Sequence, residues 1–222
     1  MIVEGLMMAM TIWYLPGWMR TETPQEGCLA AISNAFPQAT IEFKSWNGDR
    51  VWPLAVESAD YEVWRLAYEL ATMPKALRES TILVGHSLGG RMTARILARL
   101  GEKNLKVGGA YLMAAAIPST DPDLGKMGAG SVKNVVSIRN PDDITLRYVY
   151  ATVGGEHAQA FGAKGSEVPL DNVIECLTPS NLTEKVEIDR TWAKSQTLKD
   201  IANHHALFYL EYLKDVLIQA GD

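Results

Sequence analysis

The sequence predicts an α/β fold, a three-layer α/β/α sandwich in which a mostly parallel sheet lies between two layers of helices. Short apolar segments alternate along the chain with amphipathic segments of helical length, and this alternation is typical of parallel βαβ units. The segment ILVG is continuously apolar, as expected of a strand that helices cover on both faces. A chain of 222 residues suits one core of this kind, so we expect a single domain over residues 1–222.

Two strands and two helices are predicted in the first third of the chain. Residues 11–17 (TIWYLPG) form a strand that ends in a turn, and residues 39–46 (ATIEFKSW) form a second, partly alternating strand. Between them, residues 26–36 form a short helix that ends before a proline. Residues 57–73 have apolar side chains at three- and four-residue spacing, which predicts an amphipathic helix ended by the next proline.

The rest of the chain continues the alternation. Residues 80–86 (STILVGH) form a strand, and residues 88–101 form a helix with a glycine at its C-terminal end. Further strands are predicted within residues 107–117 and 131–140, and a long irregular region follows them. Residues 205–221 form the closing helix. No insertion between the predicted strands is long enough to be a separate lid domain.

Composition and charge exclude several classes of protein. The chain has 21 basic and 26 acidic residues, a formal charge of −5, without a basic cluster, so nucleic acid is not an expected partner. The apolar N-terminus contains Glu4 and lacks a basic segment and a cleavage site, so we expect neither a signal peptide nor a membrane span. Cys28 and Cys176 lie far apart and are expected to be thiols in the cytoplasm.

The string GHSLGG places Ser87 between a predicted strand and a predicted helix. So abrupt a reversal strains the central residue and leaves room only for small residues two positions before and after it, where Gly85 and Gly89 stand. The strain holds the serine hydroxyl above the carboxyl end of the strand, at the positive end of the next helix. This G-x-S-x-G nucleophile elbow makes Ser87 the expected nucleophile, and a glycine-rich turn with a capping serine is the structural alternative.

A serine nucleophile needs a base that an acid orients. The acid is expected just after a later strand, where Asp142 and Asp143 stand in SIRNPDDITL. We favour Asp143 and keep Asp142 as the alternative, because either side chain is also suited to cap a helix that starts at Ile144.

The base is expected in IANHHALFY, just before the final helix. We favour His205, because Phe208 three positions on is placed to pack beside it, and keep His204 as the alternative. His157 is expected to be a loop residue, and His86, inside the elbow, is expected to point elsewhere. The chain order is then serine, aspartate, histidine, as the nucleophile elbow requires.

Backbone N–H groups of Trp18 and Leu88 are the expected oxyanion hole. Leu88 directly follows the nucleophile, and Trp18 follows the first strand at Gly17, which permits close approach. Trp46 and Trp52 also follow strand ends and are expected to line an apolar acyl pocket, with ordinary core packing as the alternative. The histidines and cysteines have no metal-ligand spacing, so we expect no metal or cofactor.

These motifs resemble the α/β-hydrolase superfamily, and within it the uncharacterised lipase-like families. Their marks here are Gly17-Trp18 after the first core strand, the GHSLG elbow, and the segment NVVSIRNPDDITLRYVYATVGG, in which Asp143 precedes Leu146 by three positions. The resemblance extends loosely over residues 11–217 and implies a minimal α/β-hydrolase fold.

The resemblance implies a serine hydrolase that acts on a small acyl ester, a thioester or an amide. The alternatives are an acyltransferase or thioesterase with the same triad, and a catalytically silent binding protein of the same fold. Resemblance of fold does not fix the substrate.

Overall fold

A six-stranded parallel sheet forms the centre of the molecule, in the strand order β2-β1-β3-β4-β5-β6. This sheet is seen in a computed structural model of the protein. The structure describes residues 10–18, 27–150, 159–178, 204–206, 209–210 and 212–213. The predicted α/β fold class is confirmed, and the described part of the sheet is parallel throughout rather than mostly so.

The strands and helices alternate along the chain. The strands are β1 (Thr11–Leu15), β2 (Thr40–Phe43), β3 (Thr81–His86), β4 (Gly109–Met113), β5 (Val135–Arg139) and β6 (Val173–Leu177). The helices are α1 (Cys28–Ala35), α2 (Trp52–Thr72), α3 (Lys75–Glu79), α4 (Leu88–Glu102), α5 (Pro122–Lys126) and α7 (Phe161–Lys164). Two shorter turns of helix are η1 (Met127–Gly130), of 3-10 type, and η2 (Thr145–Val149), of π type.

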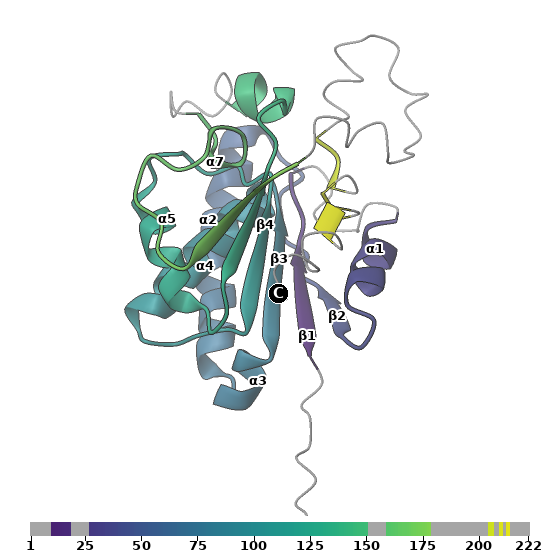
Figure 1. The fold of residues 1–222 in the computed structure, drawn as a ribbon, viewed down its shortest axis with the longest axis vertical. Coiled ribbons are helices and arrows are strands. Elements are labelled where there is room, and N and C mark those ends of the chain that lie inside the picture. The colour runs from purple at the N-terminus through teal and green to yellow at the C-terminus, as the bar shows by residue number, and fades with distance from the viewer. Residues whose placement is uncertain are drawn as a thin grey trace, which may run out of the picture.

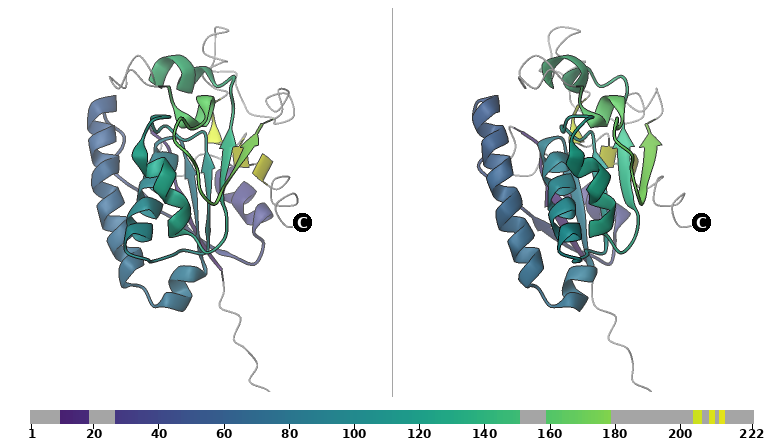
Figure 2. Two further views of the ribbon diagram at one scale, coloured as in Figure 1. Left: turned by 60° about the vertical axis from the view of Figure 1, so that its left-hand side comes forward. Right: turned by 90° about the vertical axis from the view of Figure 1, so that its left-hand side faces the viewer.

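Helices cover the two faces of the sheet in separate layers. Figure 1 shows α2 and α4 on one side, and α1 with the described C-terminal residues, in yellow, on the other. The two turned views in Figure 2 show the same layers, with α2 and α4 standing beside the strands. Within one layer α2 and α4 pack against each other, and α4 packs on β3 and β1. The structure is therefore the expected three-layer sandwich.

Burial on both faces explains why β3 has a continuous apolar sequence. All its residues are buried, and so are the four residues of β1 from Ile12 to Leu15. A strand exposed on one face would alternate apolar and polar residues instead. β1 and β3 are neighbours although β2 lies between them in sequence. The chain thus reverses its direction of travel across the sheet between these two strands, where ligands bind at the carboxyl ends in open α/β sheets.

The predicted strands are all present within the expected segments, but one helix begins earlier than expected and one strand was not expected. α2 begins at Trp52 rather than at residue 57, because Pro53 in its first turn suits a helix start. β6 lies in the region expected to be irregular. All five of its residues are partly or fully exposed at the edge of the described sheet, and Glu175 interrupts its short apolar sequence VIECL. The expected final helix is seen only at residues 206, 209–210 and 212–213.

Within the described part of the chain, no helix is both long enough and apolar enough to cross a membrane. Cys28 and Cys176 are not joined in a disulfide, as expected. Cys28 is buried and Cys176 is partly buried. The cytoplasmic location and the single-domain boundaries stay predictions.

Candidate active site

Ser87 stands at the carboxyl end of β3, between the last strand residue and the first residue of α4. Its backbone has φ 54° and ψ −117°, a strained combination for a residue with a side chain. The Ser87 N–H donates to the Met113 carbonyl at 3.0 Å, and its own carbonyl accepts from Ala116 N–H at 2.9 Å. These bonds to the end of β4 and beyond it hold the strained turn in place.

The glycines of the elbow are required by close backbone packing. A Cβ on Gly85 would collide with the Thr93 hydroxyl and with the carbonyl of Gly89. A Cβ on Gly89 would collide with the Leu15 carbonyl and would lie 2.7 Å from the Pro16 oxygen. A Cβ on Gly90 would lie 2.8 Å from the Ala115 Cβ. The strand-to-helix turn therefore presses α4 directly against the ends of the neighbouring strands.

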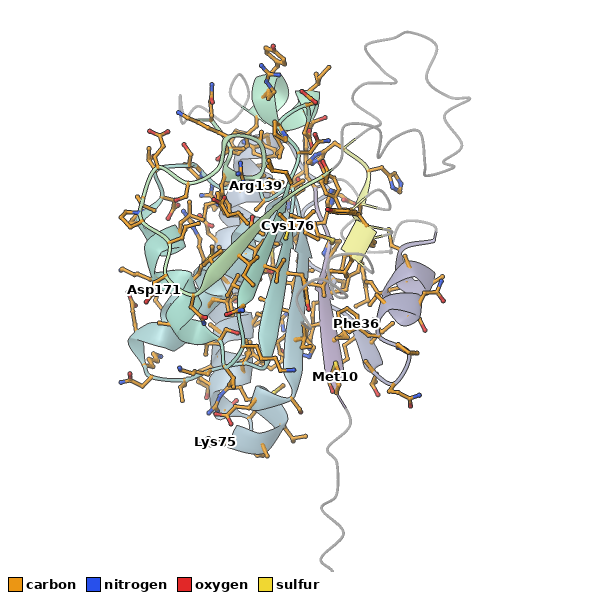
Figure 3. All side chains as sticks on the ribbon, viewed as in Figure 1. Met10, Phe36, Lys75, Arg139, Asp171 and Cys176 are labelled. Carbon is orange, nitrogen blue, oxygen red and sulfur yellow. The ribbon has the colours of Figure 1, made fainter. Side chains whose placement is uncertain are left out.

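One continuous chain of hydrogen bonds joins the predicted serine, a histidine and an aspartate. His204 Nε2 lies 2.9 Å from Ser87 Oγ, and His204 Nδ1 lies 2.6 Å from Asp143 Oδ2. Ser87 comes from the turn after β3, Asp143 from the loop after β5, and His204 from the chain before the last helical segment. Met10 and Arg139, labelled in Figure 3, mark the opposite ends of the sheet. The hydrogen-bonded residues lie at the carboxyl end, where β5 finishes at Arg139.

The histidine between Ser87 and Asp143 is His204, not the favoured His205. Adjacent side chains on a backbone point in different directions, and the His204 ring is the one that contacts both Ser87 and Asp143. The expected packing of Phe208 lies outside the described residues, as does His157. The structure thus brings together the alternative histidine with the favoured serine and aspartate.

Asp143, rather than Asp142, faces the histidine. The side chain of Asp143 is fully buried, whereas Asp142 is exposed and its backbone N–H donates to Asn140 Oδ1 at 3.0 Å. Asp143 also serves as a helix cap, because its Oδ1 accepts from Leu146 N–H at 3.0 Å. The same carboxylate therefore both caps the turn at Leu146 and contacts the histidine.

A tyrosine that the sequence did not single out contacts the same carboxylate. The Tyr209 hydroxyl donates to Asp143 Oδ2 at 2.6 Å, and its ring is fully buried. Burial raises the pKa of Asp143, but the charge and hydrogen bond of His204, and the hydrogen bonds of Tyr209 and Leu146, outweigh burial and hold this pKa below its ordinary value. Asp143 is therefore an anion at neutral pH.

The signal for Tyr209 was present in the sequence. The last segment buries Ala206, Tyr209, Leu210 and Leu213, which are spaced as the apolar face of a helix. A tyrosine on such a face must find a partner for its hydroxyl.

His86 packs against the candidate base. Its ring centroid is 4.9 Å from that of His204 and 5.8 Å from that of Tyr209. Its Nε2 is buried without a hydrogen-bond partner among the described residues. Burial lowers the pKa of His86 well below its ordinary value, and the nearby His204 and His205 lower it further. His86 is therefore a neutral ring beside His204.

The expected oxyanion donors are the backbone N–H groups of Leu88 and Trp18. Leu88 is the first residue of α4, so no carbonyl of its own helix is available to its N–H. Gly17 lies directly against the nucleophile, since a Cβ there would be 2.9 Å from Ser87 Cβ, and Trp18 follows it. Leu88 is thus the chain neighbour of Ser87 and Trp18 the chain neighbour of Gly17, and their role as oxyanion donors stays a prediction.

Trp46 and Trp52, the two tryptophans expected to line an acyl pocket, differ in what they contact. Trp46 is buried and its indole N–H donates to the Pro16 carbonyl at 3.1 Å, which favours the structural alternative of holding the loop after β1. Trp52 stacks edge-on against Trp18, at 5.2 Å between centroids, and against Tyr150, at 5.7 Å. These rings form an aromatic group beside the loop that carries Trp18. The expected contact of Trp46 and Trp52 with substrate stays a prediction.

Among the residues that the structure describes, no group of three or more His, Cys, Asp or Glu side chains is placed to hold a metal ion. The groups that the site offers are a hydroxyl, an imidazole, a carboxylate and a phenol. Hydroxyl, imidazole and carboxylate in this order are the parts of a nucleophilic acyl-transfer site.

Solved structures similar to this chain include a carboxylesterase from Mesorhizobium loti, with 16% identity, a TM-score of 0.45, and 78% of this chain and 80% of that chain covered. The type II thioesterase BorB from the borrelidin biosynthetic cluster has 16% identity and a TM-score of 0.46 over 89% of this chain and 91% of its own. Arabidopsis thaliana SOBER1 has 14% identity and a TM-score of 0.45 over 88% and 98%. No model of a known protein family matches the sequence, and no curated protein matches it.

Proposed function

We propose that this protein is a serine hydrolase that cleaves an ester or thioester bond through a covalent acyl intermediate. Ser87 is the nucleophile, His204 the base and Asp143 the acid that orients it. The observation that carries the proposal is the hydrogen-bonded chain of 2.9 Å and 2.6 Å from Ser87 through His204 to Asp143. The strained elbow and the anionic Asp143 support it.

Acylation begins when Ser87 Oγ attacks the carbonyl carbon and its proton passes to His204 Nε2. Asp143 stabilises the imidazolium that forms, and the N–H groups of Leu88 and Trp18 hold the negative oxygen. The bond to the leaving group then breaks, and the departing alcohol or thiol takes the proton from His204. The acyl group is left on Ser87.

Deacylation repeats these steps with water. His204 takes a proton from water, the oxygen attacks the acyl carbon, and the bond to Ser87 breaks. The proton returns to Ser87 Oγ and the carboxylic acid leaves. Every proton transfer in these reaction steps passes through His204 Nε2. The 2.9 Å distance between His204 Nε2 and Ser87 Oγ is therefore the distance on which the proposed mechanism most depends.

Labelling with a fluorophosphonate probe tests the nucleophile and the base. Ser87→Ala should abolish labelling, and His204→Ala should slow it by about three orders of magnitude, because the base is lost. His205→Ala, the matched neighbour, should label at a rate close to wild type. All variants are first checked for folding by circular dichroism.

The same proteins are assayed on p-nitrophenyl esters and on acyl thioesters of short to medium chain length. Hydrolysis that Ser87→Ala abolishes supports the proposal, and the better acyl donor names the leaving group. A folded wild type that neither labels nor hydrolyses would overturn it. Equal loss in both histidine variants would overturn the assignment of His204.

A further inference from the structure

We propose that Tyr209 is a positioning residue that sets the basicity of the Asp143–His204 pair, by donating its hydroxyl hydrogen to the carboxylate oxygen that His204 also binds. The inference deepens the proposed function and rests on it. It assigns a role to a buried residue that lies outside the serine, histidine and aspartate.

Geometry places two donors on one oxygen. Asp143 Oδ2 lies 2.6 Å from Tyr209 Oη and 2.6 Å from His204 Nδ1. The other oxygen, Oδ1, accepts from Leu146 N–H at 3.0 Å. The carboxylate is thus held by three donors from two parts of the chain, and its orientation toward His204 does not depend on His204 alone.

The hydroxyl of Tyr209 is a permanent donor. Its ring is fully buried, and burial together with the charge of Asp143 raises the pKa of Tyr209 well above its ordinary value. The Asn140 side chain also hydrogen-bonds this hydroxyl, so the phenol has a partner on each side. Because the phenol stays protonated at neutral pH, it donates its hydrogen bond to Asp143 throughout the reaction.

A second donor on the same oxygen disperses its negative charge. Hydrogen bonds to a charged carboxylate are stronger than neutral ones. The hydrogen bond from Tyr209 offsets part of the negative charge on Asp143 Oδ2, and that part of the charge no longer stabilises an imidazolium at His204. Loss of the Tyr209 hydroxyl therefore strengthens the Asp143–His204 interaction more when His204 is protonated than when it is neutral. Loss of the hydroxyl should therefore favour the imidazolium form of His204.

Replacing Tyr209 with phenylalanine removes one hydroxyl and leaves the other titratable groups around His204 in the sequence. From the end of β3 it is faced by Ser87 and by His86, which burial keeps neutral. From the loop after β5 it is faced by Asp143, and His205 is its chain neighbour. A change confined to Tyr209 thus reports on the hydroxyl.

The experiment compares Tyr209→Phe with wild type in two measurements. The pH profile of kcat/KM should keep its shape, and its acidic limb should move to higher pH by roughly half a pH unit or more. A shift of this size needs only a small change in the free energy of one hydrogen bond. NMR titration of the His204 ring, assigned by loss of its signal in His204→Gln, should show the same shift without any substrate. Tyr14→Phe is the control, because Tyr14 is equally buried and lies in β1; its acidic limb should stay at the wild-type pH.

A fluorinated tyrosine placed at position 209 gives the opposite test and does not depend on whether Tyr209→Phe folds. Fluorine makes the phenol a stronger donor, so the acidic limb and the NMR titration should move to lower pH. If the acidic limbs of the kcat/KM profiles coincide in wild type and in both Tyr209 variants, and Ser87→Ala is inactive, the role of Tyr209 is overturned. The proposed function then still stands. An inactive wild type whose His204 titration still shifts would overturn the proposed function and leave the hydrogen-bond role intact.

Discussion

Asp143 is the residue on which the most interactions of the candidate site meet. One of its oxygens caps the turn at Leu146, and the other accepts from His204 and Tyr209. The carboxylate is fully buried, and a buried anion is costly unless hydrogen bonds replace the lost water. The same bonds that orient Asp143 toward the histidine therefore also make it tolerable inside the fold.

The free energy of unfolding should depend on pH through Asp143. Its pKa in the folded protein lies below the ordinary value, so the stabilisation is present above the unfolded pKa of about 3.9 and is lost as pH falls through the folded pKa. In urea unfolding between pH 7 and pH 3, Asp143→Asn should be less stable than wild type at pH 7, and the gap should narrow toward pH 3. Asp142→Asn, the exposed neighbour, should follow wild type throughout. A gap that stays constant with pH would contradict this.

Adjacent candidates show where reasoning about single residues fails. The sequence favoured Ser87 and Asp143, which lie in one hydrogen-bonded chain with His204, because a strained elbow and a strand end restrict which positions can present a side chain. His204 and His205 stand side by side before a helix, and no pattern of composition or spacing says which ring points at the serine. That choice depends on the path of the backbone.

The elbow between β3 and α4 is the element that positions Ser87, the proposed nucleophile. It depends on glycines because the first turn of α4 lies against the backbone at the end of β1, with Gly89 facing the carbonyls of Leu15 and Pro16. Backbone atoms in a central strand cannot move aside as the end of a flexible side chain can. The packing of two elements, rather than the freedom of φ, explains this glycine.

Gly89→Ala should therefore lower both stability and activity. We expect a loss of at least about 2 kcal/mol in the free energy of unfolding, as for other overpacked cores, together with loss of fluorophosphonate labelling. Gly109→Ala in β4 is the matched control, because a Cβ there would meet its nearest atoms only at 3.8 Å. It should unfold and label like wild type. Equal effects of both substitutions in urea unfolding would contradict the packing argument.

Elements with strong periodicity were predicted, and those without it were missed. β3 and α4 are buried almost throughout, so their apolar patterns marked them. β6 is an edge strand with exposed positions, and Asp143 precedes a short π-type turn rather than a regular helix. Edge pairing and irregular turns are stabilised by neighbours distant in sequence, which a local pattern does not contain.

At the scale of the whole molecule, a network of charges joins the layer of helices on one face of the sheet to the loop after β4. Arg95 of α4 lies 2.6 Å from Asp60 of α2 and 2.9 Å from Asp121. Asp121 also caps α5 by accepting from Asp123 N–H at 2.9 Å. The network thus connects three elements that come together only in the folded chain.

Asp121→Ala should destabilise the protein, because it removes a helix cap and leaves part of the Arg95 guanidinium without its partner. Asp121 is buried, and we expect a loss of about 1–3 kcal/mol in the free energy of unfolding. The matched control is Glu102→Ala, which removes an exposed ion pair of 2.8 Å with Lys126. That pair is open to water, so its removal should leave the urea midpoint near the wild-type value. Equal midpoints for the two variants would show that the network does not hold α2, α4 and α5 together. A lower midpoint for Asp121→Ala alone would show that a partly buried charge cluster, in addition to the apolar core, stabilises this face of the sheet.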